Sequence, residues 1–351
     1  MIGATYLNYA GLAPLRPRSA LAGVIALELF GNTRLPGFIA KTERLREEVA
    51  TWIGVRGDQV AFLASTTQAL QSVALSLPLE AGDVVLYPEG DFPSNVLVWE
   101  ALRRGGVLPL AVCDWSAPFP PRTRAIAIST VDFTTGSERP WREVCVRARA
   151  DGIWTVVDAI QSAGVKPSFS DGVDFWAAGV QKWLVSGLGL ALLVVSDRGL
   201  TLEGPRISYL ALQEPPRVAS GFASSARRFE MSGVTPGPLL RFASTLALWK
   251  RMGAATIERE VRARRDYVHE RLIEMGYAVV SDPVAWSGIV SLDPSPRVPS
   301  AVVQRGYRRR IVMAERGPYV RLSPHLFTRY RELDRALDFL WKVRSGVEDV
   351  G

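Results

Sequence analysis

The feature that most constrains the fold is the alternation of short apolar runs and helix-like stretches between about residues 45 and 195. Each apolar run is a handful of residues long, rich in β-branched or aromatic side chains, and followed by turn or capping residues, as buried strands are. Helical patterns lie between most of the runs, for example over residues 95–103 and 141–149. This alternation predicts an α/β fold in which helices cover both faces of a mostly parallel sheet. The predicted strands are residues 60–64, 84–87, 125–129, 154–157, 175–178 and 191–195.

The pattern changes after residue 236. Apolar residues near helical spacing predict one long amphipathic helix over residues 239–275. Two strand-like pieces follow, at 278–281 and 288–292, and a helix over 333–343 closes the chain. This order of elements predicts a second, smaller α+β domain.

These two patterns divide the chain into a predicted large domain, residues 16–235, and a small domain made of residues 1–15 and 236–351. A chain of 351 residues is long enough for two such units. Residues 205–218 carry three prolines and no regular period, so we expect an ordered excursion there. No repeat or low-complexity tract interrupts either domain.

Composition excludes several classes of protein. The hydrophobic fraction of 48% and the charged fraction of 22% are those of an ordinary globular protein, and no apolar run is long enough to cross a bilayer. The first residues lack a basic segment followed by a long apolar core, so we expect no secretory signal, no membrane partner and a cytoplasmic location. Cys113 and Cys145 have no motif spacing, which indicates neither a disulfide framework nor a metal site.

The net charge of +7 raises the question of a nucleic-acid partner. The excess is mostly arginine, spread in short groups with acidic residues interleaved among many of them. Solvated helix faces, or phosphate and carboxylate binding, explain this distribution at least as well. We therefore expect no nucleic-acid partner.

Two ionisable residues stand out at the ends of predicted strands, where ligands gather in open parallel sheets. Lys182 follows the strand at 175–178 and has apolar neighbours on both sides. It could be a surface lysine, but burial lowers the pKa of a lysine, as a Schiff-base lysine requires. Asp158 ends the strand at 154–157 and could either cap the following helix or belong to a site.

Two further segments occupy the same kind of position. Residues 65–68, Ser-Thr-Thr-Gln, lie between a strand and a helix. They could be a simple N-cap, or they could bind a small phosphoester through hydroxyls and the free N–H groups of the first helical turn. Phe92 follows the strand at 84–87 beside a proline, where it could be a core residue or stack on a flat cofactor ring.

In this order and spacing, the four segments resemble the class V aminotransferase family of fold-type I pyridoxal 5′-phosphate (PLP) enzymes, which includes the cysteine desulfurases. Residues 6–14 resemble the family's opening segment, residues 46–54 the helix before its phosphate loop, and residues 320–325 its carboxylate-binding segment. The resemblance therefore extends over nearly the whole chain. It implies a mostly parallel, seven-stranded type of sheet between helices, a smaller α+β domain, PLP as the cofactor, an amino-acid substrate and a homodimer with shared sites.

The resemblance also implies a role for individual residues. Lys182 would hold the cofactor as a Schiff base and move protons, Asp158 would pair with the pyridinium, and Gln161 would bind the phenolic oxygen. Arg321 would pair with the substrate α-carboxylate, for which its planar guanidinium is suited. The full predicted set is Lys182 and Asp158 as catalytic residues, Ser65, Thr66, Thr67, Phe92, Gln161, Gln181 and Thr235 as further cofactor ligands, and Arg321 and Asn8 at the substrate, with no metal.

The sequence departs from the family pattern at three places. Many members carry a serine three positions before the lysine and a histidine just before it, whereas this chain has Gly179 and Gln181. The Gly-Thr pair that reaches the neighbouring subunit's phosphate is offset here, so that Ser232 or Thr235 could serve, and Thr235 is our choice.

The reaction follows less directly from the residues. Cysteine desulfurases need a cysteine on a mobile loop shortly before the carboxylate arginine, and residues 307–317 contain none. Neither Cys113, after a strand-like run, nor Cys145, in a predicted helix, is placed for persulfide transfer. We therefore expect an aminotransferase, because amino transfer needs the fewest additional residues. The alternatives are racemisation, a lyase acting at the β or γ carbon, and a non-catalytic PLP-fold binding protein.

Overall fold

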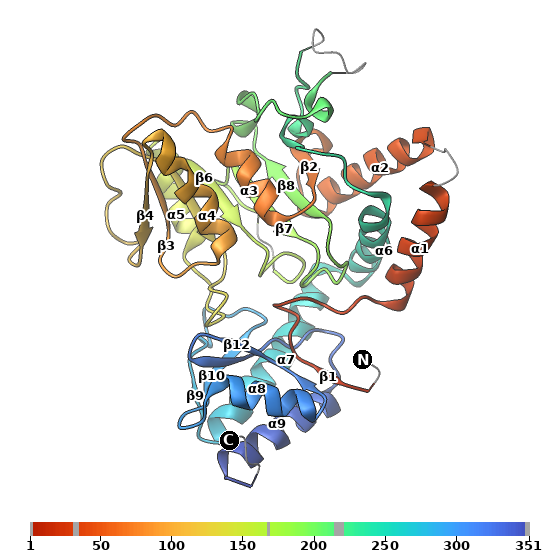
Figure 1. Ribbon diagram of the computed structural model, residues 1–351, viewed down its shortest axis with the longest axis vertical. Coiled ribbons are helices and arrows are strands. Elements are labelled where there is room, and N and C mark those ends of the chain that lie inside the picture. The colour runs from red at the N-terminus through yellow and green to blue at the C-terminus, as the bar shows by residue number, and fades with distance from the viewer. Residues whose placement is uncertain (1–2, 31–34, 167–168, 214–220, 348–351) are drawn as a thin grey trace.

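The computed structural model describes residues 3–30, 35–166, 169–213 and 221–347. It has two lobes, an upper one built on a large sheet and a lower one with smaller sheets (Figure 1). None of the helices in the described part of the chain is long and apolar enough to span a membrane.

The upper lobe contains a seven-stranded sheet in the order β2-β8-β7-β6-β5-β3-β4. Neighbouring strands from β4 to β7 are parallel, whereas β8 runs antiparallel to both β2 and β7. The predicted mostly parallel sheet is confirmed. The strands are β2 (Val60–Leu63), β3 (Val84–Pro88), β4 (Leu108–Val112), β5 (Thr123–Ser129), β6 (Trp154–Asp158), β7 (Phe175–Gly179) and β8 (Ala191–Val195).

Both faces of this sheet are buried. Along β5, Ile126 and Ile128 pack into one apolar cluster, while Ala125 and Ala127 pack into another on the opposite face. Helices α3 and α4 contribute to the second cluster, and α2, α5 and α6 to the first. The helices of the upper lobe are α1 (Pro17–Phe30), α2 (Leu35–Ile53), α3 (Thr66–Ala74), α4 (Pro93–Glu100), α5 (Trp141–Ala150) and α6 (Pro236–Met252).

The lower lobe has a core of its own, built on an antiparallel four-stranded sheet in the order β12-β13-β10-β9. The N-terminal strand β1 joins this lobe by pairing in parallel with β11. That pairing supports the predicted grouping of residues 1–15 with the C-terminal part, although the domain boundaries stay a prediction. The elements are β1 (Thr5–Tyr6), α7 (Ala254–Glu274), β9 (Ala278–Val279), β10 (Val290–Asp293), α8 (Pro299–Arg308), β11 (Ile311–Val312), β12 (Ala314–Arg316), β13 (Tyr319–Leu322) and α9 (Tyr330–Arg344).

Two predictions on helices need correction. The single helix over residues 239–275 is wrong, because α6 ends at Met252 and α7 begins at Ala254. Gly253 between them has a φ of 79°, a left-handed conformation that breaks a helix and that glycine adopts without steric cost. The helix predicted over 95–103 ends at Glu100, and a 3₁₀ turn continues the chain.

The excursion predicted over residues 205–218 falls partly outside the described residues. Its described part, up to residue 213, contains a short 3₁₀ helix, Tyr209–Ala211. The small Leu212–Phe222 bridge ties this segment to the chain that leads into α6.

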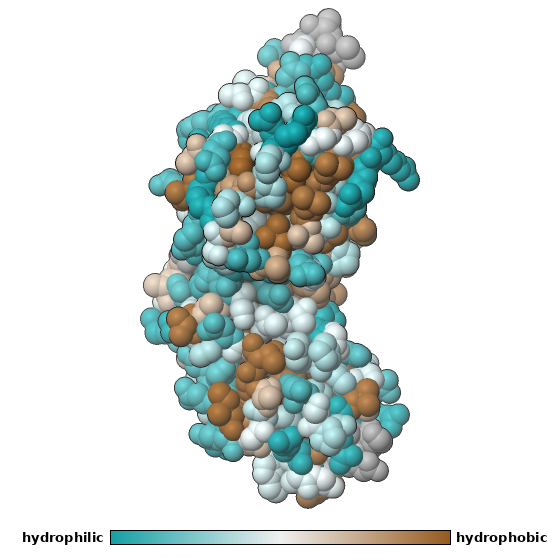
Figure 2. All heavy atoms as spheres, turned by 90° about the vertical axis from the view of Figure 1, so that its left-hand side faces the viewer, coloured by the Kyte–Doolittle hydropathy of each residue, from teal (hydrophilic) through white to brown (hydrophobic). Residues whose placement is uncertain are grey.

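Strand β4 was missed because it lies at the edge of the sheet and is largely exposed. Leu108 and Leu110 on β4, and Leu97 on α4, are among the exposed large apolar residues. Figure 2, which views the side on which β4 lies, shows apolar residues gathered on the upper lobe. Edge strands that also carry a proline, here Pro109, lack the continuous apolar run that marks a central strand.

Candidate active site

Several of the predicted site residues lie at the carboxyl ends of the central strands. Asp158 is the last residue of β6, where it lies opposite Ser129 at the end of β5 and Ala177 near the end of β7. Gly179 ends β7, three residues before Lys182. The parallel register therefore brings these segments to one edge of the sheet, as expected for an open α/β sheet.

Lys182 and Asp158 are both buried, with exposed fractions of 8% and 3%. Burial raises the pKa of the Asp158 carboxyl, and Asp91 adds to that rise, while the Ile160 backbone N–H and Lys182 oppose it. Burial lowers the pKa of the Lys182 amine, and the nearby cations Arg321 and Arg316 lower it further, against the pull of Asp158. The surface-lysine interpretation of Lys182 is therefore wrong.

A tight apolar loop presents Lys182. Val180, Trp183 and Leu184 are fully or almost fully buried, and the Val185 N–H donates to the Lys182 carbonyl oxygen over 3.0 Å. Val185 has a φ of 42°, which a β-branched residue rarely adopts. Such strain persists only where the surrounding packing enforces it, and it is frequent at functional sites.

The hydroxyls at the start of α3 are not equivalent. Ser65 is the N-cap and accepts from the Gln68 N–H, while Thr67 donates to Ser94 Oγ over 2.8 Å. Thr66 Oγ1 is buried and has no hydrogen-bond partner among the described residues. Burying a hydroxyl without a hydrogen-bond partner costs free energy, so among these three hydroxyls that of Thr66 most needs a ligand.

Gly179 and Gln181 adjoin Thr66. A Cβ at position 179 would lie 2.9 Å from Thr66 Oγ1 and would collide with the Gln181 side-chain oxygen. The space in which many relatives place a serine is thus occupied here by the side chain of Gln181.

Aromatic rings line the approach to Lys182. Lys182 Nζ lies 5.4 Å from the centroid of the Phe92 ring, and Phe92 meets Phe133 edge-on at 5.3 Å. Phe92 is 40% exposed, so the core interpretation of this residue is wrong.

Gln161 is buried, and both ends of its amide have partners within the chain. Its Nε2 donates to the Ala10 carbonyl oxygen and its Oε1 accepts from Trp183 Nε1, both over 3.1 Å. In this arrangement Gln161 ties the N-terminal segment to the Lys182 loop, and its predicted bond to a phenolic oxygen stays a prediction.

Arg321 lies on β13 with an exposed fraction of 1%. Its Nη1 donates to the Phe133 carbonyl oxygen over 2.7 Å, its Nη2 to Asn8 Oδ1 over 3.4 Å, and its Nε has no partner among the described residues. Burial, with help from Arg316, lowers the pKa of Arg321 to about 9. The surface ion-pair interpretation of Arg321 is therefore wrong, because the guanidinium is buried and has no carboxylate partner among the described residues, and its anion-binding role stays a prediction.

Thr235 and Ser232 are not joined to this cluster within the chain. Both are exposed, Thr235 immediately before α6, and neither hydrogen-bonds to the site residues in the described part of the protein. Their predicted contact with a neighbouring subunit's phosphate stays a prediction.

Two buried residues near the site escaped prediction. Asp91 accepts from Ser129 Oγ over 2.6 Å and from Asn95 Nδ2 over 2.9 Å, and its carboxylate raises the pKa of Asp158. His325 Nε2 donates to the Trp183 carbonyl oxygen over 3.0 Å, and the His325 ring stacks on Tyr9 at 4.5 Å. The available signals were that Asp91 directly precedes Phe92 and that His325 ends the segment 320–325, which resembles the family's carboxylate-binding segment.

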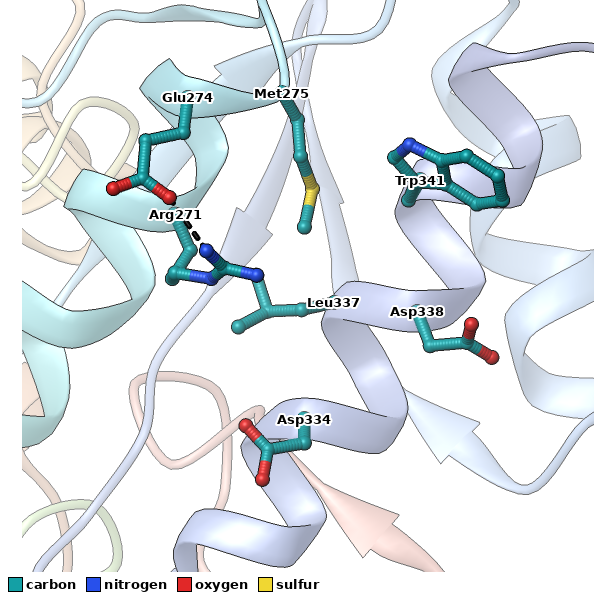
Figure 3. Close-up of a pocket in the computed structure, with 7 residues that line it drawn as sticks. All are labelled: Arg271, Glu274, Met275, Asp334, Leu337, Asp338 and Trp341. Carbon is teal, nitrogen blue, oxygen red and sulfur yellow. Dashed lines mark hydrogen bonds and ion pairs between the residues drawn. The ribbon is translucent and has the colours of Figure 1, made fainter.

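One pocket of the described surface lies far from the predicted site residues in the fold. A pocket between α7 and α9 contains an Arg271–Glu274 ion pair at 2.6 Å beside Met275 and Trp341 (Figure 3). None of its lining residues belongs to the Lys182 cluster. Among the described residues, no group of three or more histidine, cysteine or acidic side chains could hold a metal ion.

The family model for aminotransferase class-V matches residues 33–295. The chain belongs to this family. Within it, the isopenicillin N epimerase of Streptomyces clavuligerus is 29% identical, over 95% of this chain and 93% of its own length. The uncharacterized aminotransferase YcbU of Bacillus subtilis is 28% identical, over 88% and 86%.

Solved structures agree on the fold. The cystine C–S lyase C-DES, in complex with its product cysteine persulfide, matches with a TM-score of 0.90 at 20% identity, over 97% of this chain and 98% of that one. A cysteine desulfurase from Thermococcus onnurineus NA1 matches with a TM-score of 0.85 at 20% identity, over 98% and 95%. The fold of this class-V aminotransferase family member is therefore that of the fold-type I PLP enzymes.

The protein is accordingly a PLP-dependent enzyme that acts on an amino acid. Its residues fit that cofactor on structural grounds. Thr66 offers a buried hydroxyl that has no partner among the described residues, Phe92 a partly exposed ring, and Asp158 a buried carboxylate. Lys182 supplies an amine whose lowered pKa favours the neutral, nucleophilic form.

Proposed function

We propose that this class-V enzyme transfers the amino group of an amino acid, with Lys182 as the base that removes and returns protons at the substrate α-carbon. PLP, when bound, supplies a ring that accepts negative charge from that carbon. The observation that carries the proposal is the burial of Lys182 beside Asp158, because burial lowers the pKa of the amine to about 7 and so favours the neutral form that can accept a proton.

The other predicted residues would hold the cofactor and the substrate and orient them. Asp158 would keep a positive charge on the ring nitrogen, which a buried carboxylate does strongly since water does not screen it. Thr66, with Ser65, Thr67 and Gln181 around it, would bind the phosphate, and Phe92 would cover one ring face. Arg321 would bind the substrate α-carboxylate, with Asn8 holding its guanidinium in place.

Amino transfer is favoured because it needs no nucleophile beyond Lys182. Desulfuration needs a cysteine, and neither thiol of this chain is suited to it. Cys145 is buried in α5, and burial raises its pKa to about 12, while Cys113 is exposed on the segment that follows β4. A β- or γ-lyase remains the alternative that the lysine chemistry also allows.

A second candidate is epimerisation at the α-carbon. It is favoured by the likeness to the isopenicillin N epimerase of Streptomyces clavuligerus over 95% of this chain. Both reactions begin with the same proton removal by Lys182, and they differ in where the proton returns.

We also propose a homodimer in which Thr235 of one subunit reaches the phosphate of the other. The exposed position of Thr235 and its lack of partners within the described chain support this assignment. A cytoplasmic location is proposed as well, supported by the two free cysteines.

A panel of amino acids separates these reactions. The purified holoenzyme is incubated with each amino acid and a keto-acid acceptor, and keto acid, ammonia and the enantiomer ratio are measured in the same samples. Keto-acid formation that requires the acceptor supports amino transfer. Ammonia release indicates a lyase, and a changed enantiomer ratio without keto acid indicates an epimerase, either of which contradicts the first choice.

A further inference from the structure

The hairpin that carries Arg321 carries a second arginine on the same face. Strands β12 and β13 are antiparallel, with Ala314 opposite Arg321 and Arg316 opposite Tyr319. Because side chains alternate along a strand, Arg316 lies on the face of the hairpin that also holds Arg321, displaced by two residues. The guanidiniums of Arg316 and Arg321 therefore project toward the same side.

That side faces the active site. Arg321 donates to the carbonyl oxygen of Phe133, whose ring meets Phe92, and the Phe92 ring lies 5.4 Å from Lys182 Nζ. Arg316 is close enough to Lys182 and to Arg321 that its charge lowers the pKa of both groups.

Arg316 uses only part of its hydrogen-bonding capacity within the described chain. It is half-buried, and its Nη1 donates to the backbone carbonyl oxygen of Glu315 over 2.6 Å. Neither Arg316 nor Arg321 has an ion pair with a carboxylate in the part of the chain that the structure describes. Two partly desolvated cations on one face repel each other and lose hydration, and an anion between them would relieve both costs.

We propose that Arg316 binds a second carboxylate of the substrate, so that the enzyme's substrate is a dicarboxylic amino acid whose α-carboxylate lies on Arg321. This proposal rests on the proposed function, because it takes Arg321 as the α-carboxylate ligand. The planar, two-pronged donor geometry of a guanidinium suits a carboxylate. A substrate with a neutral side chain would leave Arg316 half-buried beside a second cation, with no anion to compensate its charge.

Non-reactive substrate analogues test binding without turnover. The holoenzyme is titrated with α-methylaspartate, α-methylglutamate and the neutral α-methylnorvaline, which lack the α-proton, and dissociation constants are read from the change in cofactor absorption. We expect wild type to bind at least one dicarboxylic analogue about 10- to 100-fold more tightly than the neutral one, the scale of a charge-assisted hydrogen bond. Arg316→Gln should abolish that preference and leave α-methylnorvaline binding unchanged within about twofold.

Two variants complete the design. Glu315→Gln is the matched control, because Glu315 lies on the opposite face of the same hairpin and its loss should preserve the preference. Arg321→Lys should weaken all three analogues together. Arg316→Gln should also raise the pH at which the cofactor absorption titrates, since a positive charge near Lys182 is removed.

The outcomes separate the inference from the function on which it rests. Equal binding of neutral and dicarboxylic analogues by wild type, or an unchanged preference in Arg316→Gln, overturns the role of Arg316 while amino-acid binding stands. An unmoved pH midpoint contradicts the proximity of Arg316 to Lys182. If none of the analogues changes the absorption, the proposed function itself fails and the inference with it.

Discussion

Replacing Glu230 with alanine should destabilise the upper lobe through one buried ion pair. Glu230 Oε1 lies 2.9 Å from Arg46 Nη1, and the two side chains are only 7% and 5% exposed. The same oxygen accepts from the Phe62 backbone N–H over 2.9 Å. Glu230→Ala therefore leaves a buried guanidinium and a buried N–H group short of an acceptor, which costs roughly 3–5 kcal/mol.

This cost can be translated into a melting temperature. An unfolding entropy of about 2.1 cal/mol/K per residue over 351 residues gives a fall of about 4–7 °C. Circular dichroism melts of the holoenzyme measure it. Glu43→Ala is the matched control, because Glu43 also contacts Arg46, at 3.1 Å, but is 45% exposed and should cost less than about 1 kcal/mol. Equal shifts in the two variants would refute the reasoning from burial.

Three further outcomes follow from the burial of single groups. Asp158→Asn should keep PLP through dialysis but lose turnover by roughly 100-fold or more, the scale of one preorganised electrostatic partner, and near-normal turnover would remove Asp158 from its role. A thiol reagent should modify Cys113 but not Cys145 in the native protein, because burial raises the Cys145 pKa to about 12; two thiols reacting before unfolding would contradict this. Burial lowers the pKa of His325 to about 3 from 6.5, so the folded state stays neutral while the unfolded chain binds a proton. The contribution of neutral His325 to stability is complete above pH 6.5 and is lost as pH falls toward 3. The free energy of unfolding should therefore depend less on pH over that window in His325→Gln than in wild type.

The central strands were predictable because they are buried on both faces. Strands β7 and β8, and residues 125–128 of β5, are continuous apolar runs, which are typical of strands buried on both faces of a sheet. Edge and two-residue strands give no such run, so β4 and the β1–β11 pair were missed. The break at Gly253 was hidden because α6 and α7 are both amphipathic and continue the same helical period across it.

From the residues alone, the site was predictable only where its residues follow strand ends, whereas Arg321, inside β13, was expected only through the family resemblance. Lys182, Asp158 and Phe92 lie at such strand ends, and parallel register then brings them together. Arg316 and His325 are joined to the site by long-range contacts, antiparallel pairing in one case and a bond to the Trp183 carbonyl oxygen in the other. No local pattern in a single sequence reports such contacts.

The most direct test of the central claim is to locate the cofactor on the chain. The purified protein is reduced with borohydride, digested, and analysed by mass spectrometry for a pyridoxyl group. We expect the modification on the peptide that contains Lys182, and its loss together with the visible absorption in Lys182→Ala. A pyridoxyl group on another lysine, or a colourless wild type that takes up no PLP, would contradict the account.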